Sequence, residues 1–125
     1  MKKTNYLPVP PWDMDSAAAR LKLLENDYNS LDATTISVNF TGQAEVRIGT
    51  QFLNGRKDIY QYLCKDLAAK KDYHLKLDLW GALKGRMAVR YELEWTDESE
   101  KPFKSYGVQV FQFDDNGLKL QLRLL

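Results

Sequence analysis

Residues 73–80 read YHLKLDLW and residues 87–95 read MAVRYELEW, and these two stretches decide the fold. In both, apolar and polar side chains alternate, which is typical of a strand with one buried and one exposed face. Gly81 and Gly85 frame a hairpin turn between the two strands. The register that keeps both apolar faces on one side pairs Trp80 with Arg90, Asp78 with Glu92 and Lys76 with Glu94.

Strands continue to the end of the chain. Residues 103–113 predict a third long strand and residues 118–125 a fourth, with the turn sequence DDNG at 114–117 between them. The four strands therefore form an antiparallel meander. A shorter alternating run between Gly42 and Gly49 predicts one further strand, whose buried face carries Ala44, Val46 and Ile48.

The first half of the chain is mainly helical. From Asp15 to about Leu31 an apolar stripe recurs at helical spacing, and Asp13 or Asp15 is suited to be its N-cap. The stripe consists of Ala17, Leu21, Leu24, Tyr28 and Leu31. Ile36 and Phe40 share the same spacing and predict a second, short helix.

A third helix is predicted over residues 56–71, after a turn at Asn54-Gly55, from Ile59, Leu63 and Leu67 at successive turns. Three prolines among residues 1–14 predict an arm leading into the fold, anchored by Trp12. The predicted organisation is thus an arm, residues 1–14, and a single α+β domain, residues 15–125. In that domain, three helices pack on a curved, mostly antiparallel sheet.

Composition excludes several classes of function. The chain of 125 residues has 18 Lys and Arg against 17 Asp and Glu, a formal charge of +1, and no basic stripe that would indicate nucleic-acid binding. It has no Gly-rich phosphate loop and no apolar run long enough to span a membrane. The lone His74 has no second ligand at metal-binding spacing, and Cys64 is the only cysteine. We therefore expect a soluble, cytoplasmic protein without metal or other cofactor.

Several segments together indicate a family. The sequence resembles the nuclear transport factor 2-like superfamily, cone-shaped α+β domains that include SnoaL-like polyketide cyclases and ketosteroid isomerases. It is most similar to an uncharacterised bacterial branch of SnoaL-like proteins, from about Pro10 to Leu122. The matching segments are DYNSLD at 27–32, FLNGRKDI at 52–59, LW at 79–80, MAVRYELEW at 87–95, SYG at 105–107 and FDDNGL at 113–118.

The resemblance implies a cavity between the concave face of the sheet and the helices. By alternation and by resemblance, the residues expected to point into it are Tyr28, Ile48, Leu63, Tyr91, Gln109 and Phe111. The alternative is that these side chains simply fill the core. Isomerases of the superfamily need a carboxylate base, and the matching position here is Ile48, which has no proton to exchange. Gln109 stands where the acidic hydrogen-bond donor would be, and its amide retains a donor.

Three functions remain open at this level. The first is a domain that binds a small hydrophobic molecule without acid/base chemistry. The second is a SnoaL-like isomerase or cyclase acting on a carbonyl-bearing substrate, with Gln109 and Tyr28 or Tyr91 polarising the carbonyl. The third is an interaction module with a filled core.

The opposite face of the sheet carries an unusual number of apolar groups for a solvated surface. Relatives of this fold commonly pair through that face, as the resemblance implies, so we expect a homodimer. The predicted interface consists of Trp80, Arg90, Tyr106, Val108 and Val110. In the predicted register, Trp80 and Arg90 would form a cation–π pair at its centre.

Overall fold

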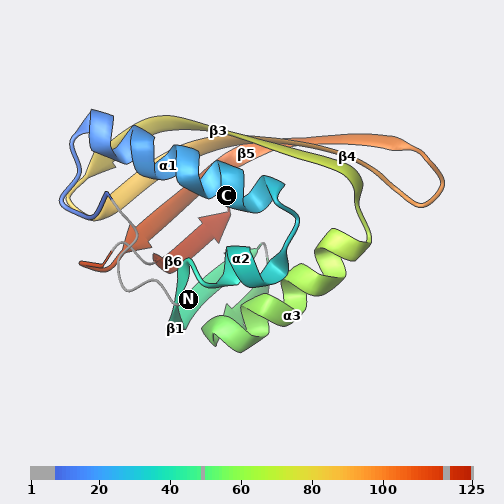
Figure 1. The fold of residues 1–125 in the computed structure, drawn as a ribbon, viewed down its shortest axis with the longest axis horizontal. Helices are drawn as coiled ribbons and strands as arrows, with labels where there is room; N and C mark the ends of the chain where they lie inside the picture. The colour runs from blue at the N-terminus through green and yellow to red at the C-terminus, as the bar shows by residue number, and fades with distance from the viewer. Residues whose placement is uncertain (1–7, 49, 117–118, 125) are drawn as a thin grey trace.

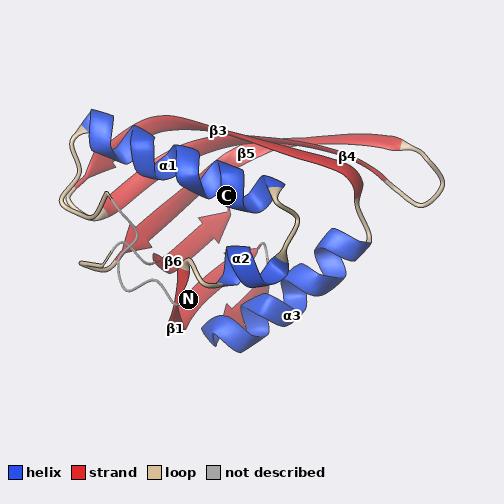
Figure 2. Cartoon of the chain, viewed as in Figure 1, coloured by secondary structure: helices blue, strands red, loops and turns tan. Residues whose placement is uncertain are grey.

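Three helices cover one face of a bent six-stranded sheet (Figures 1 and 2). The computed structural model describes residues 8–48, 50–116 and 119–124, with the side chains of 119–124 excepted. The elements in chain order are α1 (Met14–Asn29), α2 (Ala33–Ser37), β1 (Phe40–Ile48), β2 (Gln51–Asn54), α3 (Gly55–Ala68), β3 (Lys71–Leu83), β4 (Arg86–Thr96), β5 (Pro102–Phe113) and β6 (Lys119–Leu124). The predicted α+β class and the nearly antiparallel sheet are confirmed.

The strand order is β2-β1-β6-β5-β4-β3. The meander predicted from β3 to β6 is confirmed, and every neighbouring pair is antiparallel except β1 and β6, which run parallel. The short strand β2 was not predicted, because residues 51–54 precede the helix with no alternation long enough to mark a strand. Gly117, Leu118 and Leu125, which belong to the predicted last turn and strand, lie outside the described residues.

The predicted register between β3 and β4 is wrong by two residues. Arg90 lies opposite Asp78 rather than Trp80, and the other observed pairs are Lys76 with Glu92 and His74 with Glu94. One residue of the shift arises because the turn is tighter than predicted: Leu83 pairs with Arg86 across Lys84 and Gly85. The other arises at Trp80, which lies between two paired positions without a partner of its own, as the extra residue of a β-bulge does.

The helices follow the predicted stripes with two differences. Asp13 is the N-cap of α1, where its carboxylate accepts a 2.7 Å hydrogen bond from the Ser16 N–H and the Ser16 hydroxyl accepts one in return. The helix ends at Asn29, and Leu31 lies beyond it with a positive φ of 60°. Phe40 was predicted on the short helix but begins β1 instead, because α2 ends at Ser37.

The core includes one charged side chain that the sequence pattern did not indicate. Arg20 is only 1% exposed, and its guanidinium donates a 3.0 Å hydrogen bond to Asn39 Oδ1. The side-chain amide of Asn39 in turn donates a hydrogen bond to the Asp27 carboxylate. The positive charge of Arg20 is therefore linked to a negative charge through this amide. Trp12 is buried against the Phe113 ring, with centroids 5.3 Å apart, and so holds the segment directly before α1 to the sheet.

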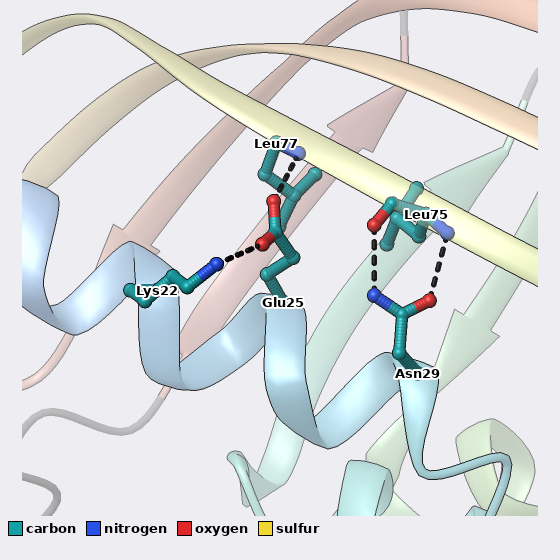
Figure 3. A network of polar contacts seen from close by, with 5 residues as sticks. All are labelled: Lys22, Glu25, Asn29, Leu75 and Leu77. Atoms are coloured by element: carbon teal, nitrogen blue, oxygen red, sulfur yellow. Dashed lines mark hydrogen bonds and ion pairs between the residues drawn. The ribbon is translucent and has the colours of Figure 1, made fainter.

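The outer edge of β3 is closed by side chains of α1 (Figure 3). Asn29 donates to Leu75 O at 2.8 Å and accepts from Leu75 N at 2.7 Å, as a neighbouring strand would. One turn earlier, Glu25 Oε2 accepts from Leu77 N at 2.8 Å while Oε1 is paired with Lys22. Partial burial tends to raise the pKa of Glu25, but these contacts outweigh it and hold the pKa below its usual value. Both residues fix α1 to the sheet at the level of the cavity.

Candidate functional site

A cavity of about 230 Å³ lies between the inner face of the sheet and the helices. Both the sheet and the helices contribute apolar side chains to its wall. Every second residue of a strand points inward, as predicted, and α3 turns its apolar stripe toward the strands. The apolar lining residues are Phe40, Val46, Ile48, Leu53, Ile59, Leu63, Leu75, Leu93 and Trp95. The polar lining residues are Tyr28, Tyr62, Asp66, Lys70, Tyr73, Tyr91, Ser105 and Gln109.

Four phenols dominate the polar part of the lining. Burial raises the pKa of Tyr28 and Tyr73 far above the usual tyrosine range, and burial also raises the pKa of Tyr62 and Tyr91. Neighbouring negative charge adds to the effect, since Asp66 raises the pKa of both Tyr62 and Tyr73. All four hydroxyls are therefore neutral at physiological pH and keep a proton to donate.

The Tyr91 ring has room in the cavity wall because the residue opposite it on the neighbouring strand is a glycine. Tyr91 on β4 pairs with Gly107 on β5, and its ring lies over the glycine. A Cβ added at Gly107 would be 2.6 Å from Cε1 of Tyr91, a distance no real contact allows. Gly107 thus provides the space that the Tyr91 ring occupies against the sheet.

One end of the cavity is charged. Asp66, in the last turn of α3, forms an ion pair with Lys70 just beyond the helix, and the two side chains are 21% and 18% exposed. Lys70 Nζ also lies 5.1 Å from the centroid of the Trp95 ring, within the range of a cation–π contact. Phe103 also stacks on the Trp95 ring, with centroids 5.2 Å apart. Asp66 is the only carboxylate among the lining residues that the structure describes.

Five of the six residues predicted to face the cavity line it: Tyr28, Ile48, Leu63, Tyr91 and Gln109. Phe111 is on the same face of β5 but lies outside the lining, fully buried against Phe113 in the core. Ligand binding by these residues stays a prediction. The sequence reasoning missed the phenols of Tyr62 and Tyr73, the Trp95 ring and the charged end of the cavity.

Two of the missed residues had a usable signal. Tyr73 and Trp95 share the alternating face of Tyr91 and Leu75 in strands that were predicted, so their inward direction followed from the pattern. Asp66 and Lys70 did not have such a signal, because an acid and a base four residues apart on a helix are equally typical of a solvated surface. Cys64 is exposed and is not among the residues that line the cavity. Within the described ranges, no three His, Cys, Asp or Glu side chains converge as metal ligands would, and no helix is long and apolar enough to cross a membrane.

The outer face of the sheet presents the residues predicted for an interface. Trp80 is 62% exposed and Tyr106 is 55% exposed, while Val108 and Val110 are half-buried. The predicted cation–π pair of Trp80 with Arg90 is wrong, because Arg90 lies opposite Asp78 and Trp80 lies in the bulge without a partner in the register. Arg90 instead lies over the Tyr106 ring at 5.4 Å and pairs with Glu92 at 2.9 Å.

The fold, the cavity and the sequence segments point to one family, and a comparison with family descriptions decides it. Residues 10–124 match the family described as "Protein of unknown function (DUF1348)". The chain belongs to this family. A comparison with curated proteins finds no match.

Solved structures place the DUF1348 chain in the nuclear transport factor 2-like fold. An NTF2-like protein of unknown function from Exiguobacterium sp. 255-15 is 14% identical, with a TM-score of 0.72 over 84% of this chain and 95% of that one. The epoxide hydrolase/cyclase-like enzyme SalBIII, which has a role in pyran ring formation in polyether salinomycin, is 20% identical, with a TM-score of 0.73 over 90% and 93%.

A third similar structure was solved with a small molecule. It is a hypothetical protein of ketosteroid isomerase-like fold from Catenulispora acidiphila DSM 44928, in complex with trimethylamine. It is 8% identical, with a TM-score of 0.75 over 84% of this chain and 82% of that one. The predicted resemblance to the NTF2-like superfamily is thereby confirmed, and at these identities the likeness concerns the fold alone.

Proposed function

We propose that this DUF1348 protein binds a small, mostly apolar molecule in the cavity, without acid/base catalysis, and that it does so as a homodimer. The observation that supports binding most strongly is the composition of the wall. Apolar side chains from strands β1 to β4 and helix α3 surround a space that neutral hydroxyls and one amide also border. A few polar groups in an apolar wall are the usual arrangement of a ligand site. The apolar wall buries the surface of the ligand, and the polar groups fix its orientation.

The volume limits the size of the ligand. At about 230 Å³, the cavity exceeds the roughly 150 Å³ of an engineered apolar cavity that takes up benzene. It is smaller than the roughly 300 Å³ at which pockets for drug-sized molecules begin. A molecule of one or two rings fits between these limits. Because Tyr62, Tyr73 and Tyr91 are neutral, any one of them can donate a hydrogen bond to an oxygen on such a molecule.

The same lining argues against isomerase chemistry. Ile48 stands where the resemblance implies the carboxylate base, and it contributes only methyl groups to the cavity wall. Asp66 also lines the cavity, but its carboxylate is already engaged by the Lys70 ammonium. We therefore favour binding over turnover.

The outer face of the sheet supports the homodimer. Its charges are compensated within the face: Arg90 pairs with Glu92, and Lys104 lies 3.3 Å from Glu94. Tyr106 lies between the two cations, 5.4 Å from Arg90 and 5.3 Å from Lys104. A face with paired charges and an exposed tryptophan can meet its own copy without like-charge repulsion, as a two-fold interface requires.

Thermal unfolding with and without 1-indanone tests the binding proposal. This ketone has two fused rings and one oxygen acceptor, and binding to the folded state alone raises the unfolding temperature as its concentration increases. Ser105→Phe places a ring in the cavity and should abolish the increase. Ser99→Phe, in the exposed loop between β4 and β5, is the matched control and should retain it. An unfolding temperature that is independent of 1-indanone in the unmodified protein would refute the choice of a neutral two-ring ligand.

A further inference from the structure

The charged end of the cavity already holds a cation. Lys70 Nζ is paired with the Asp66 carboxylate and lies 5.1 Å from the centre of the Trp95 ring. Both charged side chains line the cavity, and both are about four-fifths buried. The ammonium therefore does not lie on the open surface but in the wall of the proposed ligand site.

The surroundings of that ammonium favour positive charge from several directions. Asp66 is in the last turn of α3, so the partial negative charge of the helix C-terminus adds to that of the carboxylate. Tyr62 and Tyr73 both border the same space and are close enough to Asp66 for its charge to raise their pKa. Trp95 supplies an electron-rich ring face of the kind that binds alkylammonium groups in proteins.

We propose that the cavity binds a molecule with an alkylammonium group, and that this group replaces the Lys70 ammonium between Asp66 and Trp95. The inference rests on the proposed function, because it names the class of ligand for the same cavity. Lys70 is able to leave: it lies beyond the end of α3, its stem is flexible, and its side chain retains contact with solvent. In the free protein it acts as an internal substitute for the ligand.

A carboxylate ligand fits this end of the cavity less well. It would meet the Lys70 ammonium, but it would lie beside Asp66 and the helix C-terminus, both of which repel it. A neutral ligand would leave the ion pair as it is and gain nothing from it. The charge of the ligand therefore distinguishes the three classes experimentally.

The test compares two ligands of the same shape by calorimetry and by ligand-observed NMR. Phenyltrimethylammonium and tert-butylbenzene differ only in a charged nitrogen in place of a carbon. In the Lys70→Met variant, which removes the competing ammonium and keeps an unbranched apolar stem one atom shorter, we expect phenyltrimethylammonium to bind about tenfold more tightly than in the unmodified protein. The affinity for tert-butylbenzene should change less than twofold.

The double variant Asp66→Asn/Lys70→Met should lose the preference for the charged ligand and still bind tert-butylbenzene. If Lys70→Met leaves the affinity for phenyltrimethylammonium unchanged or lowers it, the inference is overturned, whereas binding of tert-butylbenzene would still support an apolar site. If neither ligand binds any of the three proteins, the proposed function fails as well. Circular dichroism and thermal unfolding of each variant establish that it is folded.

Discussion

Replacement of Asn29 by alanine should detach the edge of β3 from α1. The side chain makes two hydrogen bonds to the backbone of Leu75, at 2.8 and 2.7 Å, and β3 is an edge strand of the sheet in the described part of the chain (Figure 3). Two such bonds contribute about 1 kcal/mol each, and partly buried groups left without a partner add to the loss. Alanine restores about 0.5 kcal/mol through its higher helix propensity. The net loss in the free energy of unfolding is therefore about 1.5–2.5 kcal/mol.

Urea denaturation measures this loss, and Asn26→Ala is the matched control. Asn26 is the same residue type on the same helix but is exposed, so its replacement should change the free energy of unfolding by less than about 0.5 kcal/mol. Thermal unfolding should show the same order, with a decrease of about 5–10 °C for Asn29→Ala. Equal stability of the two variants would show that the side chain of Asn29 does not hold the strand.

Three other predictions concern the edge, the cavity wall and the outer face. Because the folded state lowers the pKa of Glu25, the ionised side chain stabilises the protein above pH 4.5, and this stabilisation is lost as the pH falls through the folded pKa. The Glu25→Gln variant should therefore lose less stability between pH 6 and pH 3 than the unmodified protein. Urea midpoints at the two pH values measure this difference. Gly107→Ala should lower the free energy of unfolding by about 1–3 kcal/mol, because its Cβ displaces the Tyr91 ring. This loss should disappear when Tyr91 is replaced by leucine, and an equal loss with and without Tyr91→Leu would contradict the contact. Trp80→Glu should halve the mass found by sedimentation equilibrium, and an unchanged mass would exclude the outer face as the interface.

The sequence predicted the direction of side chains better than the pairing of strands. Alternation over residues 73–80 and 87–95 was enough to place Leu75 and Tyr91 inside, because a strand has only two faces. It was not enough to set the register, since the bulge at Trp80 inserts a residue without breaking the alternation on either side. The parallel pairing of β1 with β6 joins segments that are far apart in the sequence, and nothing local indicates it.

The cavity was predicted in outline, and its chemistry was not. Ile48 and Gln109 could be placed by resemblance to a fold, because the inward positions of the sheet are set by the backbone. Whether an inward residue borders open space or fills it depends on its neighbours in three dimensions, which is why Phe111 lies in the core instead. The position of the Asp66–Lys70 pair in the cavity wall depends on how α3 packs against β1, β2 and β3, and the sequence does not indicate that packing.

The most direct test of whether the cavity binds a ligand is a titration in which NMR monitors the methyl groups of the protein. With 1-indanone or phenyltrimethylammonium as the added molecule, we predict saturable shifts of the methyl resonances of Leu53, Leu63 and Leu93, which line the cavity. The methyl resonances of Val108 and Val110 on the outer face should not move. Shifts confined to the outer face, or no shift with either molecule up to its solubility limit, would contradict the account.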